Sequence, residues 1–291
     1  MKTKKTSVNQ ITEGVIWKQL LFFFFPIMLG TLFQQLYNTA DAVVVGRFVG
    51  TQALAAVGGS TGQMVNLIVG FFVGLSSGAT VIIARYYGAK NKKELNDTLH
   101  TAAALSIVGS VIITIAGIAL TPFMLKLMNT PKDVIQGSST YLRIYFAGII
   151  FVFIYNVGSA ILRAVGDSKR PLYFLIVCCF INIFLDVLLV VGFNMGVAGA
   201  ALATVISQAV SAVLVIYALM NSKDMYCLKP KEIHFHKFLF LSIVTIGLPA
   251  GIQSVMYNLS NMIIQTSLND LGTSTMAAYT AFWQNSMPFI G

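Results

Sequence analysis

The sequence predicts an all-α membrane protein, built as a polytopic bundle of transmembrane helices. Three observations carry this prediction: 56% of the 291 residues are hydrophobic, only 10% are charged, and long apolar stretches recur along the whole chain. Soluble domains usually carry about 25% charged residues, and a membrane-spanning helix needs about 20 mostly apolar residues. The composition therefore excludes a soluble domain, and the length allows several spans.

Apolar stretches between charged or turn-forming segments predict seven spans and the start of an eighth. Lys2, Lys4 and Lys5 precede the first span as in a signal peptide, but no small-residue cleavage site follows, so an uncleaved first helix is expected. The chain ends at Gly291, inside the eighth apolar stretch, and is expected to be part of a longer protein. The predicted spans are approximately 16–45, 54–84, 98–126, 135–162, 171–191, 198–220 and 239–268, with the eighth beginning near 275.

Basic residues are distributed unevenly between the two sides of these spans. With the N-terminus in the cytoplasm, all of the 19 lysines and arginines except Arg47, Lys126, Lys132 and Arg143 fall on the cytoplasmic side. Cytoplasmic loops of membrane proteins carry this excess, which also favours contact with anionic lipid head groups. The net charge of +9 thus indicates topology. The basic residues form no continuous face with aromatic side chains, so no nucleic-acid partner is expected.

A segment near the start of the chain recurs after the sixth span. Pro26 and residues 49–56 correspond to Pro249 and residues 271–278, with a shift of one residue between the two matches. Chance similarity between apolar helices is the alternative. An even number of spans separates the copies, so both would enter the membrane from the same side, as in the parallel repeats of some transporters. The predicted domains are a first six-helix lobe at 1–222, a basic cytoplasmic linker at 223–237 and the start of a second lobe at 238–291.

Two acidic residues, Asp41 and Asp186, lie inside predicted spans, whereas the others lie in loops or at span ends. A charged residue at the centre of a spanning helix costs about 2.5–3.5 kcal/mol on insertion scales, so it usually faces a partner or a cavity. Gln34 and Asn38 share a helix face with Asp41, and Asn182 shares one with Asp186. Interhelical hydrogen bonding is the alternative role for these side chains. Burial favours the protonated form of a carboxylate, which suits the loading and release of a proton.

The seventh predicted span repeats the polar stripe without an acidic residue. Asn258, Asn261 and Gln265 lie at positions i, i+3 and i+7, which places them on one side of a helix. They are candidates for contact with a substrate across a central cleft, or for helix packing alone. Thr204 lies in the small-residue segment 199–204 of the sixth span, where packing is a sufficient explanation.

Other patterns in the sequence indicate no enzyme and no metal centre. His234 and His236 have no third ligand nearby in the chain. The three cysteines, Cys178, Cys179 and Cys227, form no C-x-x-C pair. The chain contains no phosphate-binding loop ending in G-K-[ST], and no serine or cysteine is paired with a histidine base.

Taken together, the motifs resemble the multidrug and toxic compound extrusion (MATE) family over essentially the whole chain. The resemblance implies a twelve-helix protein with two six-helix lobes that exchanges cationic amphiphilic compounds for protons or sodium ions. This chain would then hold the first lobe and part of the second, with no cofactor besides the coupling ion. The motifs are Pro26 with Gln-Gln-Leu-Tyr-Asn-Thr-Ala-Asp at 34–41, Arg-Ala-Val-Gly-Asp at 163–167 followed by Pro171, Asn182 to Asp186, and Gly199 to Thr204.

The resemblance also implies where the coupling ion binds. Family members place polar residues of helices one, four, five and six in a cavity of the first lobe, and the matching positions are Asp41, Asn156, Asn182, Asp186 and Thr204. The sequence context of Asn156 is the least distinctive. A sodium ion would be held by the other four, and occupancy by Na⁺ or H⁺ would bias the equilibrium between inward- and outward-facing states. Candidates for the substrate cavity are Gln34, Asn38, Asn258, Asn261 and Gln265.

Two other functions stay open. A lipid-linked oligosaccharide flippase of the same superfamily would share the fold, but it moves a polyanionic lipid and should line its cavity with basic residues. Arg85, Arg143 and Arg163 all lie close to predicted membrane faces, which weighs against this function. A membrane protein without a transport role would use the polar stripes as helix contacts, and replacing Asp41 or Asp186 would then alter stability alone.

Overall fold

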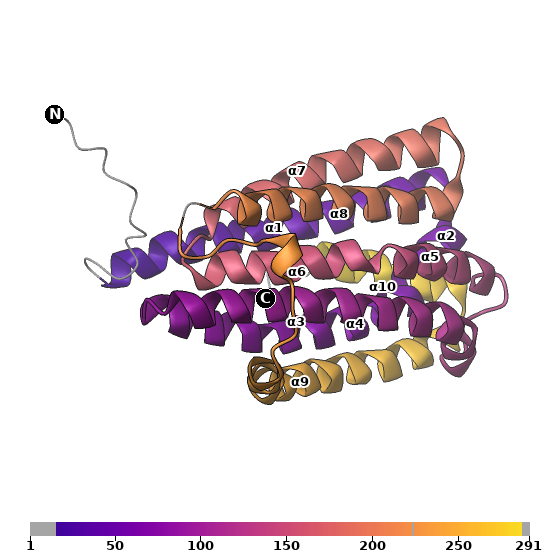
Figure 1. Cartoon of the computed structure of the whole chain (residues 1–291). Helices are drawn as coiled ribbons and strands as arrows, with labels where there is room; N and C mark the ends of the chain where they lie inside the picture. The colour runs from indigo at the N-terminus through magenta and orange to yellow at the C-terminus, as the bar shows by residue number, and fades with distance from the viewer. Residues whose placement is uncertain (1–15, 223, 287–291) are drawn as a thin grey trace.

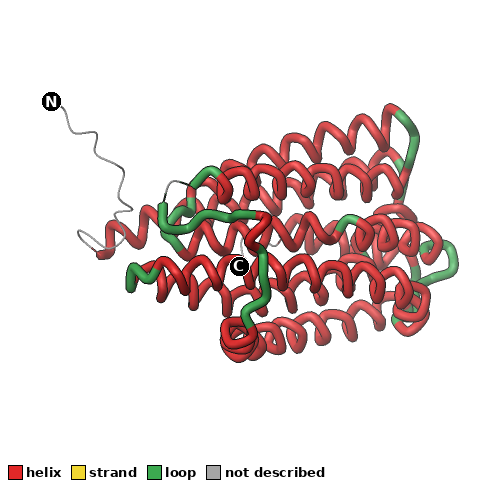
Figure 2. The backbone as a smooth tube through the Cα atoms, viewed as in Figure 1, coloured by secondary structure: helices red, strands yellow, loops and turns green. Residues whose placement is uncertain are grey.

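The structure, a computed structural model, describes residues 16–222 and 224–286 as a bundle of helices (Figure 1). Most of the connections between the helices are short, the one from α8 to α9 is long, and the described residues include no strand (Figure 2). The helices are α1 (Ile16–Phe48), α2 (Thr51–Gly58), α3 (Ser60–Gly88), α4 (Lys92–Leu127), α5 (Ile135–Ala147), α6 (Ile149–Ala164), α7 (Lys169–Asp186), the π-helical η2 (Val187–Gly192), α8 (Gly196–Met220), the 3₁₀ turn η3 (Pro230–Glu232), α9 (Lys237–Asn269) and α10 (Thr273–Ser286).

The helices confirm the predicted all-α membrane bundle. Six of the described helices are long and apolar enough to cross a membrane, and α5 with α6 would make a seventh span. The third span starts earlier than predicted, at Lys92, because the side chain of Asn91 accepts a hydrogen bond from the Glu94 N–H (3.3 Å) and caps the helix. The apolar pattern therefore predicted the part of α4 that crosses the membrane. It did not predict the polar first turns of this helix.

Two predicted spans, 54–84 and 135–162, are interrupted rather than continuous. The first is divided at Gly59, between α2 and α3. The second bends by 53° between α5 and α6, at Gly148. A Cβ atom added to Gly148 would lie 2.3 Å from Cγ1 of Val205 on α8, so glycine is what permits α8 to approach the bend. A third departure from a regular helix is the π-helical continuation of α7 as η2.

The two copies of the predicted repeat adopt the same local structure. Helices α1 and α9 each contain 33 residues and an internal proline, Pro26 or Pro249. Each helix is followed by a glycine with positive φ, Gly50 at 113° and Gly272 at 91°, a backbone region that other residues rarely adopt. The next helix then begins one residue later, at a threonine. These parallels support an internal repeat, whereas the division into two lobes stays a prediction.

Helices from distant parts of the chain pack against one another in the core. Helix α1 packs on α7, α8 packs on α6 and α7, and α9 lies alongside α3 (Figure 1). The contact between α3 and α9 brings their backbones together: a Cβ added to Gly78 would lie 2.1 Å from Ile243 O, and one added to Gly247 would lie 2.2 Å from Leu75 O. Glycine at these positions lets the two helices touch.

The predicted linker is a structured strap that packs on α3 and α4. We use "strap" for residues 224–236, which run from the end of α8 to the start of α9 (Figure 2). Tyr226 is 4% exposed and Leu228 is 8% exposed. The Lys229 N–H donates a hydrogen bond to Nε2 of His100 on α4 (3.2 Å), and the Tyr87 hydroxyl of α3 donates to Asp224 Oδ2 (2.9 Å). The strap therefore ties the start of α9 to the first six spans.

Replacing His100 with phenylalanine is expected to loosen the strap. Nδ1 of His100 lies 2.7 Å from Asn96 O, so this nitrogen carries the hydrogen and Nε2 is the acceptor for Lys229. Phenylalanine keeps the ring but leaves the Lys229 N–H unpaired, which costs about 1–3 kcal/mol. Trypsin should then cut after Lys231 about fivefold faster or more, since proteolysis follows the population of the opened form.

His236→Phe is the matched control for this measurement. The His236 side chain is exposed, and only its backbone N–H contacts α4, by donating to Thr101 Oγ1 (3.3 Å). Replacing His236 with phenylalanine should therefore leave the rate of tryptic cleavage in the strap unchanged. Equal rates for the two variants would show that the His100 side chain does not hold the strap.

Candidate functional site

Four predicted site residues lie buried where α1, α7 and α8 meet. Asp41 is 7% exposed, Thr204 is 1% exposed, and Asn182 and Asp186 are fully buried. The two carboxylates are close enough to interact electrostatically, although they come from α1 and α7. Asn182 lies one helical turn before Asp186 on the buried side of α7. The structure thus brings together residues that the sequence places up to 163 positions apart.

The local geometry of α7 and α8 presents these side chains to α1. Asp186 is the last α-helical residue of α7, and the π-helical segment η2 begins at the next position. Such π-helical segments are rare and frequently occur at functional sites. On α8, Ala200, Ala201 and Ala203 are fully buried, and these small side chains let α8 approach its neighbours. Thr204 is buried on α8, which packs on both α5 and α7.

Most polar atoms of this cluster have no hydrogen-bond partner among the described residues. They are Asp41 Oδ1, both side-chain polar atoms of Asn182, both carboxylate oxygens of Asp186, and Thr204 Oγ1. Buried polar groups are normally paired, and a buried charge that lacks a partner costs several kcal/mol. Carboxylate, amide and hydroxyl oxygens are ligands of hard cations, and a proton would neutralise either carboxylate. The cluster is therefore chemically suited to bind a small cation or a proton.

Two tyrosines lie near the acidic pair, and the sequence analysis did not predict them as site residues. Tyr37 lies one turn before Asp41 on α1. Tyr141 on α5 lies near both carboxylates and near Thr204, although Thr204 Oγ1 has no partner with hydrogen-bond geometry. The i, i+4 spacing of Tyr37 and Asp41 was a usable signal. The position of Tyr141 depends on the packing of α5 and had no local signal.

Three predicted site residues have no hydrogen bond to this cluster among the described residues. They are Asn156, Asn38 and Gln34. The Asn156 amide donates to Val152 O of its own helix (2.8 Å). The Asn38 amide donates to Gln35 Oε1 (3.2 Å), also within its helix. Gln34 is exposed on α1. The assignment of Asn156 to the ion site, and of Gln34 and Asn38 to the substrate cavity, stays a prediction.

The polar stripe of α9 faces α3 rather than the acidic pair. Asn258 is 8% exposed, and its Nδ2 would lie 3.0 Å from a Cβ added to Gly70 of α3. Gln265 is 1% exposed and donates to Asn269 Oδ1 (2.9 Å). Asn261 is half-buried. The hydrogen bonds that Asn258 and Gln265 donate, to Ser254 and Asn269, lie within α9, and the role of both residues in a substrate cavity stays a prediction.

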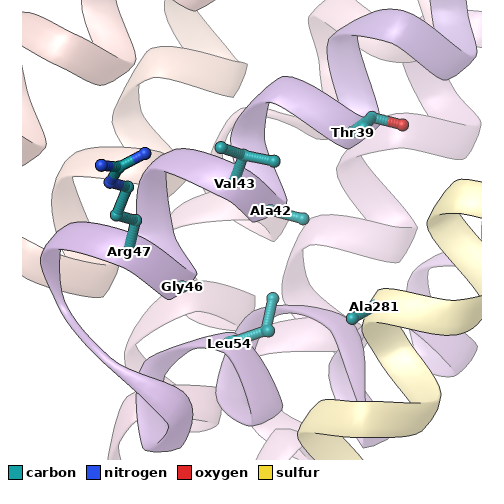
Figure 3. A pocket seen from close by; sticks show the side chains of 7 residues that line it. All are labelled: Thr39, Ala42, Val43, Gly46, Arg47, Leu54 and Ala281. Carbon is teal, nitrogen blue, oxygen red and sulfur yellow. The ribbon is translucent and has the colours of Figure 1, made fainter.

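A pocket of about 290 Å³ lies between α1, α2 and α10 (Figure 3). On α1 its lining begins at Thr39 and ends at Arg47, and Leu54 and Ala281 face it from the other two helices (Figure 3). Asp41 is absent from the lining because, at 100° per residue, its side chain leaves α1 on the opposite side. The acidic pair is therefore enclosed by helices and separated from this pocket by α1. The lining residues are Thr39, Ala42, Val43, Gly46, Arg47, Leu54 and Ala281.

Comparisons with known proteins agree with this architecture. The MatE family model matches residues 26–188, which is more than half of the chain. A curated relative, the probable multidrug resistance protein YoeA of Bacillus subtilis (strain 168), is 32% identical over 91% of this chain and 58% of its own length. The chain thus spans about three fifths of the length of this relative.

Solved structures of MATE transporters share the fold. An outward-facing multidrug resistance MATE family transporter of the MOP superfamily matches 98% of this chain and 63% of its own, with a TM-score of 0.85 and 26% identity. An inward-facing structure described in the same terms matches 88% of this chain and 59% of its own, with a TM-score of 0.82 and 26% identity. The motifs, the helical fold and the family model agree: this chain belongs to the MatE family of membrane transporters.

Proposed function

We propose that this chain forms the first lobe, the linker and the start of the second lobe of a secondary active efflux transporter. The transporter exchanges cationic amphiphilic compounds for H⁺ or Na⁺ by alternating access. The observation that carries this proposal is the buried acidic pair, Asp41 and Asp186, whose oxygens have unfilled hydrogen-bonding capacity among the described residues. In the proposed domain division, the first lobe is 1–222, the linker is 223–237 and the second lobe starts at 238.

The acidic pair can couple ion binding to a conformational change. Two carboxylates in a medium of low dielectric constant repel each other strongly when both are charged. A proton on either one, or Na⁺ held by Asp41 and Asp186 with oxygens of Asn182 and Thr204, removes this repulsion. An ion drives transport only if it binds one conformation more tightly than the other. Asp41 and Asp186 come from different helices, so a relative movement of α1 and α7 would change the affinity.

The charge distribution and the relatives support the proposed substrate class and location. Among the described residues, Asp41 and Asp186 are buried and no lysine or arginine is, which favours a cationic substrate over a polyanionic lipid. The relative YoeA is named as a probable multidrug resistance protein. We place the protein in the plasma membrane with a cytoplasmic N-terminus. The exposed lysines Lys90, Lys92 and Lys93 at the turn between α3 and α4 would then contact anionic lipids of the inner leaflet.

Energised efflux of ethidium from cells that express the complete transporter tests the proposal. Efflux should exceed that of cells with an empty vector. It should stop when an ionophore collapses the gradient of the coupling ion. One ionophore is used for the proton gradient and another for the sodium gradient, and the one that stops efflux identifies the ion. Efflux that persists without both gradients would contradict antiport. Absence of ethidium efflux, combined with movement of a lipid-linked oligosaccharide, would replace this function with that of a flippase.

A further inference from the structure

A buried hydrogen-bond network joins the end of α9 to α3 and to the loop after α4. Asn269, the last residue of α9, is 3% exposed. Its Nδ2 donates to Ser60 Oγ (2.9 Å) and to Met128 O (2.5 Å), and its Oδ1 accepts from Gln265 Nε2 (2.9 Å). The Thr130 hydroxyl donates to Ser60 Oγ (3.0 Å). We call Ser60, Thr130 and Asn269 the clasp.

Further polar contacts surround the clasp at the surface. The Thr273 hydroxyl donates to Asp133 Oδ2 (2.7 Å), and the Asn129 amide donates to Asp270 Oδ1 (3.4 Å). Both contacts connect the turn between α9 and α10 with the loop between α4 and α5. In Figure 1 this turn lies at the end of the bundle where α2 and α5 are labelled. The polar contacts therefore hold the region between α9 and α10 against the loop between α4 and α5.

The interface between α3 and α9 changes in character along its length. Near the start of α9 it is a contact between backbones, at Gly78 and Gly247. Near the end of α9 it includes buried polar side chains: Asn269 donates to Ser60 Oγ, and Gln265 donates to Asn269. Glycine contacts are lost when helices separate, because lipid or water cannot restore the packing. Hydrogen-bonded side chains can exchange their partners for water at modest net cost. The interface between α3 and α9 is thus suited to stay closed at the glycine contact, near the start of α9. It is suited to open at the polar side chains, near the end of α9.

We propose that the clasp is the outer gate of the transporter, and that the glycine contact of α3 with α9 is the pivot about which it opens. The proposal rests on the proposed function and on the proposed orientation, which places the clasp on the extracellular side. When the gate is closed, the network is dry and Asn269 has partners for both its amide hydrogens and its carbonyl oxygen. When the gate opens, α9 and α10 move away from Ser60 and Thr130, and a substrate can leave outward.

Disulfide crosslinking in the complete transporter tests the gate. The native cysteines of this chain, Cys178, Cys179 and Cys227, are replaced with alanine. The gate pair is then Ser60→Cys with Asn269→Cys, which joins α3 to α9. The control pair is Ser60→Cys with Thr130→Cys, which shares one position and the same network but links two elements on one side of the gate. Ethidium efflux is measured before oxidation, after oxidation and after reduction.

Both pairs should crosslink on oxidation. The gate pair should lose efflux when crosslinked and regain it on reduction, whereas the control pair should show the same efflux before oxidation, after oxidation and after reduction. Full efflux through a crosslinked gate pair would overturn the proposal. So would a control pair that crosslinks while the gate pair does not, because the clasp would then not form in the membrane. Absence of efflux before oxidation, also in the protein that lacks only Cys178, Cys179 and Cys227, would overturn the proposed function and the gate with it.

Discussion

Replacing Asp41 or Asp186 with asparagine should reduce ion-driven efflux to background while the protein remains folded. Asparagine has nearly the same shape but cannot release a proton or offer a charged oxygen to Na⁺. Both residues are buried, at 7% and 0% exposure, so a neutral amide removes a desolvated charge and should not destabilise the bundle. Loss of efflux without loss of folded protein separates a coupling role from a role in helix packing.

The same variants should lose stabilisation by the coupling ion. A ligand that binds only the folded state at 100 times its dissociation constant adds about 2.7 kcal/mol to the free energy of unfolding. The wild-type protein should therefore melt at a higher temperature with the coupling ion than without it, and the double variant should melt at the same temperature in both conditions. Comparing Na⁺ with choline at constant pH, and then acid with neutral pH in choline, identifies the ion.

Glu232→Gln is the control for these measurements. Glu232 forms an exposed ion pair with Lys229 (2.9 Å) on the strap, and exposed pairs contribute about 0–1 kcal/mol. This variant should retain both efflux and the response of the melting temperature to the ion. Undiminished efflux in Asp41→Asn and Asp186→Asn would remove the acidic pair from the coupling mechanism.

Replacing Gly78 with alanine should sharply lower the yield and the melting temperature of the protein. The added Cβ would lie 2.1 Å from Ile243 O and 2.8 Å from Gly247 N, both backbone atoms of α9. A flexible side chain cannot move aside here, so α3 and α9 must separate along the interface. Overpacking of this kind costs about 1–3 kcal/mol and occasionally more, and the lost contacts of neighbouring glycines add to it.

Gly88→Ala is the matched control on the same helix. No atom lies within 4 Å of a Cβ added to Gly88, so this substitution should be tolerated. Membrane yield after detergent extraction and the melting temperature are measured for both variants. Equal values for Gly78→Ala and Gly88→Ala would show that α3 and α9 are not in backbone contact in the membrane.

The sequence by itself determined the class of the protein, most of its spans and its two buried acidic residues. These features depend on local composition, since about 20 apolar residues mark a span wherever they occur, and a carboxylate inside such a span is conspicuous. The repeat was also readable, because Pro26 and Pro249 and the glycines Gly50 and Gly272 impose the same local backbone twice. Local signals therefore predicted local structure.

Only the tertiary structure decided how these segments meet. The bend at Gly148 is packed against Val205, and Tyr141 of α5 lies near Asp41 of α1, although these residues are far apart in the sequence. The stripe of α9 packs on α3, and Asn269 bonds to Ser60, which is 209 residues away in the chain. Periodicity predicts which side of a helix is polar, but the partner of that side depends on the packing of the whole bundle.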